Sequence, residues 1–226
     1  LRAKAVVVPV NPMNTTNELK FYIQDCESKI AIVGQELYQE ISPLLKETSL
    51  ENIVVAAYSD YHTSMEETLV PEVKSARMNF EDKRAHLWKD ILQTNLPIQP
   101  FEGQSDDMAV IPYTSGTTGL PKGCVHTNRT VQANVVSAAN WLNTTTDSVH
   151  LSALPFFHVT GMLHSMHTPI YTGATMVILT RWNREHAVSF IENYRCTHWI
   201  NISTMVIDFL ANPNLADYDI SSLFCI

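Results

Sequence analysis

Residues 113–123, YTSGTTGLPKG, combine the residue types that a polyphosphate site needs. Three glycines permit backbone conformations closed to other residues, so that amide N–H groups can approach an anion closely. Four small hydroxyl residues add hydrogen-bond donors, and a hydroxyl can also be a ligand of Mg²⁺. Lys122, directly after Pro121, supplies a positive charge near the end of the stretch. The stretch therefore predicts a loop that binds a polyphosphate.

Other interpretations of this stretch fit less well. A flexible linker has a similar composition, but here the apolar run MAVIP at 108–112 leads directly into the stretch. A Walker loop, G-x-x-x-x-G-K-[ST], is excluded because Pro121 and Gly123 flank Lys122. The Rossmann pattern G-x-G-x-x-G is absent, and a nucleophile elbow, G-x-S-x-G, fails because Tyr113 takes the place of its first glycine.

Two predicted elements must position this loop. The run at 108–112 predicts a strand before it, and Thr127 or Asn128 can cap a helix after it, with an apolar face made of Val131, Val135, Ala138 and Leu142. A loop between a buried strand and a helix lies at the carboxyl edge of an open α/β sheet, where such sheets bind their ligands.

Strand and helix patterns alternate along the rest of the chain. Residues 5–10 are β-branched and apolar on both faces, as in a buried parallel strand, and Thr15 with Glu18 forms a capping box that opens a helix. Further strands are predicted at 29–33, 52–57, 149–154, 174–179, 197–202 and 223–226. Further helices are predicted at 37–45, 84–93, 162–167, 184–194 and 204–211, and the predicted core includes Trp182, Phe190, Ile191 and Trp199. This alternation is typical of an α/β fold with mostly parallel sheets flanked by helices.

The chain divides into three predicted segments. Residues 1–57 read as a βαβαβ segment, 58–105 as an irregular connection or insertion, and 106–226 as the segment with the phosphate loop. Because the sequence opens next to one apolar run and stops inside another, we expect a piece of a longer protein.

Composition limits the function further. Lys+Arg 15 against Asp+Glu 23 gives a net charge of −8, which argues against a nucleic-acid partner. No apolar run is long enough to span a bilayer, and no N-terminal segment resembles a signal peptide. The four cysteines form no C-x-x-C pair, which indicates reduced thiols and a cytoplasmic location. Peripheral membrane association and homo-oligomerisation stay open.

The whole of YTSGTTGLPKG resembles the signature of the adenylate-forming superfamily, which contains acyl-CoA synthetases, aryl-CoA ligases, luciferases and the adenylation domains of peptide synthetases. Residues 5–33 look like the stretch that precedes this signature in acyl-CoA synthetases, and KGCVHTN at 122–128 resembles its usual exit. LPFFHVTGM at 154–162 is similar to the second landmark of the family, a P-x-x-H-x-x-G element beside the acyl pocket. Nearly the whole chain is similar to the middle of the large N-terminal domain, and 58–105 is the loosest part.

The resemblance implies a luciferase-like fold and an ATP-dependent carboxylic acid–CoA ligase, which forms an acyl-adenylate and then a thioester with ATP, Mg²⁺ and coenzyme A. The acid is expected to be a fatty or similarly apolar acid. An aryl-acid ligase, an amino-acid-adenylating enzyme and a non-catalytic nucleotide- or partner-binding remnant stay open as alternatives. Several family landmarks, among them the C-terminal domain with its adenylation lysine, have no counterpart here, so residues 1–226 alone are expected to be inactive.

The resemblance also implies roles for single residues. The loop residues that would contact the β and γ phosphates of ATP are Thr114, Ser115, Gly116, Thr117, Thr118, Gly119 and Lys122. Thr114 would also be a hydroxyl ligand of Mg²⁺. His158 would orient the carboxylate or gate the acyl pocket, and Gly161 would let the substrate approach the backbone. From the residues alone, His158 also fits a hydrogen-bonded core histidine. His164 and His167 share one face of the predicted helix, but no carboxylate or thiol joins them to complete a metal site.

Overall fold

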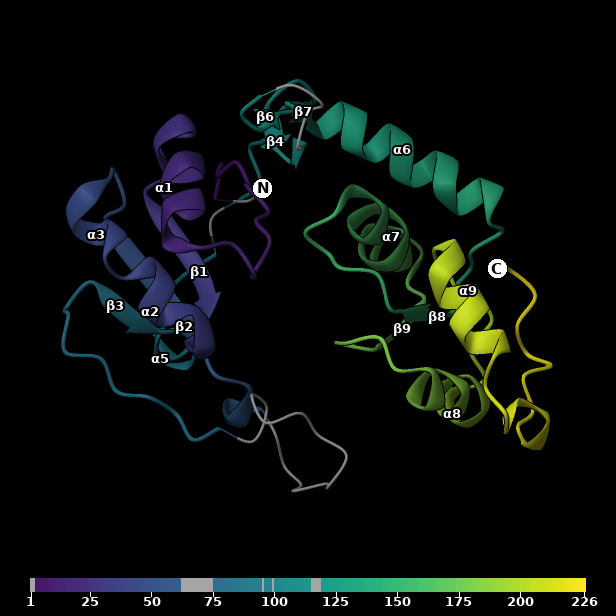
Figure 1. Cartoon of the computed structure of the whole chain (residues 1–226). Helices are drawn as coiled ribbons and strands as arrows, with labels where there is room; N and C mark the ends of the chain where they lie inside the picture. The colour runs from purple at the N-terminus through teal and green to yellow at the C-terminus, as the bar shows by residue number, and fades with distance from the viewer. Residues whose placement is uncertain (1–2, 62–74, 95, 99, 115–118) are drawn as a thin grey trace. The chain divides into compact units, whose positions relative to one another are not determined.

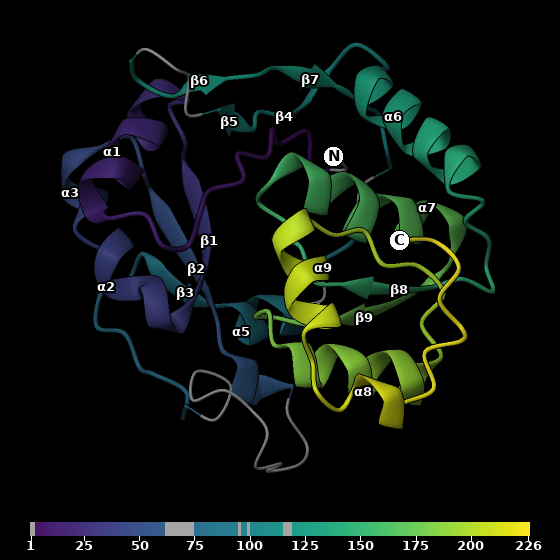
Figure 2. The ribbon, with the colours of Figure 1, turned by 45° about the vertical axis from the view of Figure 1, so that its right-hand side comes forward.

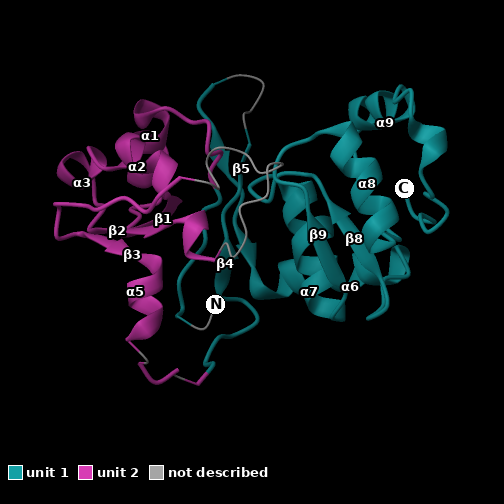
Figure 3. Cartoon of the chain, turned by 90° about the horizontal axis from the view of Figure 1, so that it is seen from below, with its two compact units in different colours: residues 1–9, 101–226 teal, residues 10–100 magenta. Residues whose placement is uncertain are grey.

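A computed structural model describes residues 3–61, 75–94, 96–98, 100–114 and 119–226 of the chain (Figure 1). They belong to two compact units, one of residues 10–100 and one that combines residues 1–9 with 101–226 (Figure 3). We call these the 10–100 unit and the 101–226 unit. Each unit holds a parallel sheet with helices around it, which confirms the predicted α/β class.

The 10–100 unit is built on a three-stranded parallel sheet in the order β1 (Ile30–Gly34), β2 (Asn52–Ala56), β3 (Ala85–Leu87). Its helices are α1 (Thr16–Asp25), α2 (Tyr38–Ile41), α3 (Leu44–Glu47) and α5 (Trp88–Gln93), with 3₁₀ turns η1 (Gln35–Leu37) and η2 (Tyr58–Asp60). Its core consists of Ile23, Ile41, Leu44, Leu45, Leu50, Ile53 and Val55. The predicted capping box forms, since the Thr15 N–H donates to Glu18 Oε2 at 2.7 Å.

Two predictions for this half of the chain were wrong. Residues 5–10 form no strand: only Val7 makes an isolated parallel bridge, with Val110. Pro9 cannot donate to a ladder, which limits the pairing to a few residues. The connection at 58–105 is less irregular than predicted, because β3 within it pairs with β2. At three residues, β3 is too short to show a pattern in the sequence.

The 101–226 unit contains more elements. Its strands are β4 (Met108–Val110), β5 (Tyr113–Thr114), β6 (Lys122–Gly123), β7 (His126–Thr127), β8 (Val149–Ser152) and β9 (Thr175–Ile178). Its helices are α6 (Asn128–Trp141), the π-helix η3 (Gly161–His167), α7 (Thr168–Thr172), α8 (Arg184–Tyr194), α9 (Ser203–Leu210) and the 3₁₀ turn η4 (Leu215–Asp217).

The parallel strands β8 and β9 lie between α7 on one side and α8 on the other (Figure 2). Side chains on the α8 side form an apolar core with Leu151, Val177, Ala187, Val188, Ile191, Trp199 and Phe209. The predicted core residues Trp199 and Ile191 are buried there, and Trp182 stacks on Trp199 with ring centroids 5.4 Å apart.

The last two predicted strands, 197–202 and 223–226, are reduced to single bridges. His198 bridges His150 in β8, and Cys225 bridges His198. The pairing ends soon after Trp199, where the Asn201 amide turns back to donate to the Trp199 carbonyl at 2.9 Å. Within the described part of the chain, no helix is long and apolar enough to cross a membrane.

The face of β8 opposite the apolar core is polar. The buried rings of His150 and His198 stack there, with centroids 4.5 Å apart and planes 13° apart. His198 Nε2 lies 2.9 Å from the Leu142 carbonyl, which can only accept, so this nitrogen carries a proton. Its Nδ1 lies 2.8 Å from the Thr197 hydroxyl. The pKa of His150 is lowered from 6.5 to about 4, first because burial disfavours the imidazolium and second because His198 and His164 are near.

This shift makes the stability of the chain depend on pH. Between pH 6.5 and 4 the unfolded chain binds more protons at His150 than the folded chain does. The free energy of unfolding should therefore be fully retained above pH 6.5 and fall by about 3 kcal/mol as the pH drops to 4. Urea unfolding at a series of pH values measures this.

His150→Phe keeps a flat ring in the stack and cannot titrate, so it should reduce the pH dependence in this window. The part due to His164 and His167, whose pKa burial also lowers, should remain. His186→Phe is the matched control, since the His186 ring stacks on Phe190 in α8, away from the buried pair. Equal pH profiles for His150→Phe and the unchanged chain would show that His150 is not responsible.

Candidate functional site

The described ends of the predicted phosphate loop are two paired strands. Strands β5 and β6 run antiparallel, with Tyr113 opposite Gly123 and Thr114 opposite Lys122. Thr114, Gly119 and Lys122 are exposed to solvent. Gly119 has a φ of 144°, which only glycine adopts easily, so its place in the loop follows from backbone freedom. Ser115, Gly116, Thr117 and Thr118 lie outside the described residues.

The described arms of the loop form an antiparallel hairpin, whereas the sequence predicted a place at the carboxyl edge of a parallel sheet. Before the tip, β4 pairs with β7 through Met108–Thr127 and Val110–His126, and β5 and β6 continue the two arms. The returning arm KGCVHT has a weak strand pattern, so its pairing was not visible in the sequence.

Gly123 allows the two arms to lie close together. A Cβ on this residue would lie 2.7 Å from Ile111 Cγ2 and 3.2 Å from Tyr113 Cζ. The glycine that follows Lys122 is therefore needed for packing across the hairpin, and it brings the lysine directly opposite Thr114.

The first N–H groups of α6 are already hydrogen-bonded to other groups of the chain. The N–H groups of Asn128 and Arg129 donate to the carbonyls of Asp107 at 3.0 Å and Ser105 at 2.8 Å. The N–H of Thr130 donates to the hydroxyl of the N-cap residue Thr127 at 3.3 Å. A phosphate at a helix N-terminus needs such groups free. These three N–H groups are therefore not available to an anion.

His158 lies in a tight turn between β8 and η3. Its N–H donates to the Pro155 carbonyl at 3.1 Å, and its carbonyl accepts the N–H of Met162 at 2.9 Å. Its ring nitrogen Nδ1 accepts the Thr160 N–H at 3.3 Å, so the neutral ring carries its proton on Nε2. His158 is exposed, in contrast to the core histidine that its residue pattern also fits, and its Nε2–H can donate to a carboxylate.

Gly161 is buried and has a structural reason to be glycine. A Cβ at this position would overlap the carbonyl oxygen of Pro155 and lie 2.8 Å from that of Leu154. The close approach is to the protein's own backbone, which differs from the predicted approach of a substrate. The glycine lets the first turn of η3 rest on the segment that follows β8.

His164 and His167 lie further along η3, and burial lowers the pKa of both. Among the described residues, no group of three or more histidines, cysteines or carboxylates is placed to hold a metal ion. His164 Nδ1 is buried, has no hydrogen-bond partner among the described residues and lies near His150.

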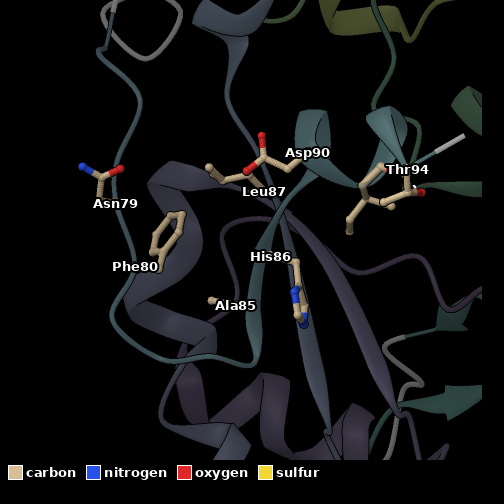
Figure 4. Close-up of a pocket in the computed structure, with 8 residues that line it drawn as sticks. Asn79, Phe80, Ala85, His86, Leu87, Asp90 and Thr94 are labelled. Carbon is tan, nitrogen blue, oxygen red and sulfur yellow. Dashed lines mark hydrogen bonds between the residues drawn. The ribbon is translucent and has the colours of Figure 1, made fainter.

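The 10–100 unit has a hollow of about 380 Å³ beside β3 and α5 (Figure 4). Its lining is Asn79, Phe80, Ala85, His86, Leu87, Asp90, Ile91 and Thr94. His86 is already paired with the Asn52 amide oxygen at 3.0 Å, and Phe80 packs on Tyr38. None of the predicted site residues that the structure describes lines it.

Comparisons with known proteins agree with this arrangement. A model of the family described as AMP-binding enzyme matches residues 1–226. The chain is 28% identical over 231 residues to a long-chain-fatty-acid–CoA ligase of Bacillus subtilis (strain 168), covering 99% of this chain and 41% of the relative. The chain thus spans less than half of that relative.

Two solved structures show the same fold. The anthranilate CoA ligase in complex with anthranoyl-AMP matches with a TM-score of 0.76 at 23% identity, over 98% of this chain and 40% of that chain. The luciferase-like enzyme from the Zophobas morio mealworm matches with a TM-score of 0.74 at 21% identity, over 98% and 47%. The predicted luciferase-like fold is confirmed.

The contact at Gly161 yields a stability prediction. Gly161→Ala should lower the free energy of unfolding by about 1–3 kcal/mol, because the added methyl group must displace the Pro155 carbonyl. Urea unfolding of the chain measures this loss. Thr160→Ala is the control, since the Thr160 side chain makes no cap hydrogen bond to η3. A loss at Gly161 no larger than that at Thr160 would contradict the prediction.

Proposed function

The chain belongs to the AMP-binding enzyme family, and from this we propose that it is part of an ATP-dependent carboxylic acid–CoA ligase acting on a fatty or other apolar acid. One observation carries the proposal: similarity to a long-chain-fatty-acid–CoA ligase extends over 99% of the chain, including both the hairpin loop and the His158 turn. The chain spans 41% of that relative, so the activity is proposed for the full-length protein.

The proposed reaction has two steps. A carboxylate is a poor electrophile because its leaving group would be oxide. Its oxygen therefore attacks the α-phosphorus of ATP, and the bond to pyrophosphate breaks to give an acyl-adenylate. The sulfur of coenzyme A then attacks the acyl carbon, and AMP leaves as the thioester forms. Negative charge builds up on pyrophosphate in the first step, so fixed donors and cations around it lower the barrier.

The hairpin loop is proposed to supply those groups. Residues 114–119 and Lys122 would bind the β and γ phosphates, and the occupied N-terminus of α6 leaves this task to them. Lys122 is exposed opposite Thr114 and has no ion pair with another described residue. The exposed Thr114 hydroxyl fits a ligand of Mg²⁺, which when bound would neutralise part of the phosphate charge.

The turn after β8 is proposed to bind the carboxylate of the acid substrate. The Thr160 N–H fixes His158 Nδ1 as an acceptor, so the neutral ring presents an N–H donor at Nε2. A carboxylate accepts such a bond, and the exposed ring could orient it toward ATP. Gly161 contributes by holding this turn against Pro155. Coenzyme A is the proposed thiol, and the cytoplasm the proposed location.

ATP–pyrophosphate exchange on the full-length protein tests the proposal. The panel should contain saturated fatty acids of increasing length, aromatic acids such as benzoate and anthranilate, and several amino acids. Fastest exchange with a fatty acid supports the proposal. An aryl acid is the second candidate, because the structural neighbour with TM-score 0.76 is an anthranilate CoA ligase. Absence of exchange with every acid would favour a non-catalytic nucleotide-binding protein.

Lys122 provides a sharper test of the phosphate site. Lys122→Ala in the full-length protein should raise KM for ATP about ten- to a hundred-fold, since a charge-assisted hydrogen bond is lost. The KM for the acid should stay within about two-fold of its original value.

Two variants control for the loss of charge. Lys122→Arg keeps the charge and should lose less than Lys122→Ala. Lys29→Ala removes an exposed lysine that pairs with Glu51 at 3.0 Å in the 10–100 unit, and should leave KM for ATP unchanged. If Lys122→Ala behaves like Lys29→Ala, Lys122 does not bind phosphate.

A further inference from the structure

The helix after the His158 turn is wider than an α-helix. Residues Gly161–His167 form the π-helix η3, a helix type whose characteristic hydrogen bond runs from an N–H to the carbonyl five residues back. At its end both the N–H and the hydroxyl of Thr168 donate to the carbonyl of Leu163, the hydroxyl at 2.9 Å. The α-helix α7 (Thr168–Thr172) follows directly.

Pro169 explains where the wide helix stops. Proline has no N–H, so the five-residue bond from position 169 to His164 cannot form. The ordinary four-residue bond from position 169 to Ser165 cannot form either. The carbonyl of Ser165 therefore lacks its α-helical donor, although Ser165 is 2% exposed. Because this carbonyl is buried and has lost its α-helical donor, a hydrogen bond from a side chain contributes to stabilising it.

The partner comes from the neighbouring strand. Ser152, the last residue of β8, donates its hydroxyl to the Ser165 carbonyl at 2.9 Å. Ser152 is 1% exposed, so water does not compete for either group. This side chain donates to the carbonyl whose α-helical bond proline removes, and it joins the end of β8 to the middle of η3.

The segment between these two anchors carries the proposed acid-binding residue. Residues 153–160 leave β8 at Ser152 and enter η3 at Gly161, and His158 lies within them. Gly161 rests on the Pro155 carbonyl, and Met162 donates to the His158 carbonyl at 2.9 Å. The position of the His158 turn is therefore determined by how η3 lies against β8.

We propose that Ser152 is a positioning residue, which holds η3 against β8 through the Ser165 carbonyl and thereby places the His158 turn for the acid substrate. The effect on acid binding rests on the proposed function, whereas the contact between η3 and β8 does not. The loop at 113–123 stands on the β5–β6 hairpin, so binding of ATP does not depend on this bond.

Two measurements on the full-length protein test this. In ATP–pyrophosphate exchange with the best acid of the panel, Ser152→Ala should raise KM for the acid about ten-fold, as expected for an unsatisfied buried carbonyl. KM for ATP should change by less than about two-fold. In hydrogen exchange followed by mass spectrometry, amides of 161–168 should exchange faster, while those of α8 should not.

Ser148→Ala is the matched control. Ser148 is a buried serine directly before β8, and its hydroxyl accepts the Thr145 N–H, outside η3, at 2.9 Å. It should change neither KM for the acid nor exchange at 161–168. Equal effects of Ser148→Ala and Ser152→Ala would reduce Ser152 to a general structural role and overturn the proposal.

Pro169→Ala tests the reason for the bond. Alanine restores an N–H that can reach the Ser165 carbonyl, so Ser152→Ala should have a smaller effect in the Pro169→Ala background than alone. If Ser152→Ala alone does not fold, recovery of folding in the double variant with Pro169→Ala gives the same test. An undiminished effect would show that Ser152 does not replace the bond lost to proline.

The outcomes separate this inference from the proposed function. If no acid supports pyrophosphate exchange, the proposed function fails, and with it the role in acid binding. Hydrogen exchange then still decides whether Ser152 holds η3. If acids are activated but Ser152→Ala leaves KM for the acid within two-fold, the function stands and the positioning role is overturned.

Discussion

The alternation of side chains along β8 is the constraint on which the 101–226 unit depends. Leu151 points into the apolar core with α8 and α9, whereas His150 and Ser152 face the opposite side, where η3 and the end of α6 lie. One strand thus serves an apolar layer on one face and a hydrogen-bonded layer on the other. A shift of one residue in its register would exchange the two sets and bury histidines among leucines.

The polar layer is stable only because most of its groups find partners. His198 satisfies the Leu142 carbonyl at the end of α6, and Ser152 satisfies the Ser165 carbonyl in η3. His150 Nε2 and His164 Nδ1 are the buried atoms there without a partner among the described residues. Burial, and then the nearby rings of His198 and His164, lower the pKa of His150, so this ring stays neutral.

The β5–β6 hairpin differs from this layer because it places a charged side chain at the surface. The protein has a net charge of −8, yet Lys122 stands exposed opposite a hydroxyl residue at the base of the loop. The α6 N-terminus, which could have contributed a partial positive charge, is used to anchor residues 105–107. The local placement of one cation, rather than the overall charge, sets the electrostatics there.

Much of this could be predicted from local sequence. The capping box of Thr15 and Glu18, the 3.6-residue periodicity of α6 and α8, and the unusual composition of YTSGTTGLPKG depend on neighbours in the chain, so their patterns are visible without a structure. The family and its α/β fold followed from them.

Contacts between distant residues decided the rest. They set the antiparallel pairing of 122–127 with 108–114, the strand β3, and the single bridges at Val7, His198 and Cys225. They also decided the polar face of β8: nothing near Ser152 in the sequence shows that Pro169 leaves a carbonyl for it to satisfy. That bond exists because strand and helix meet in space, which only the tertiary structure brings about.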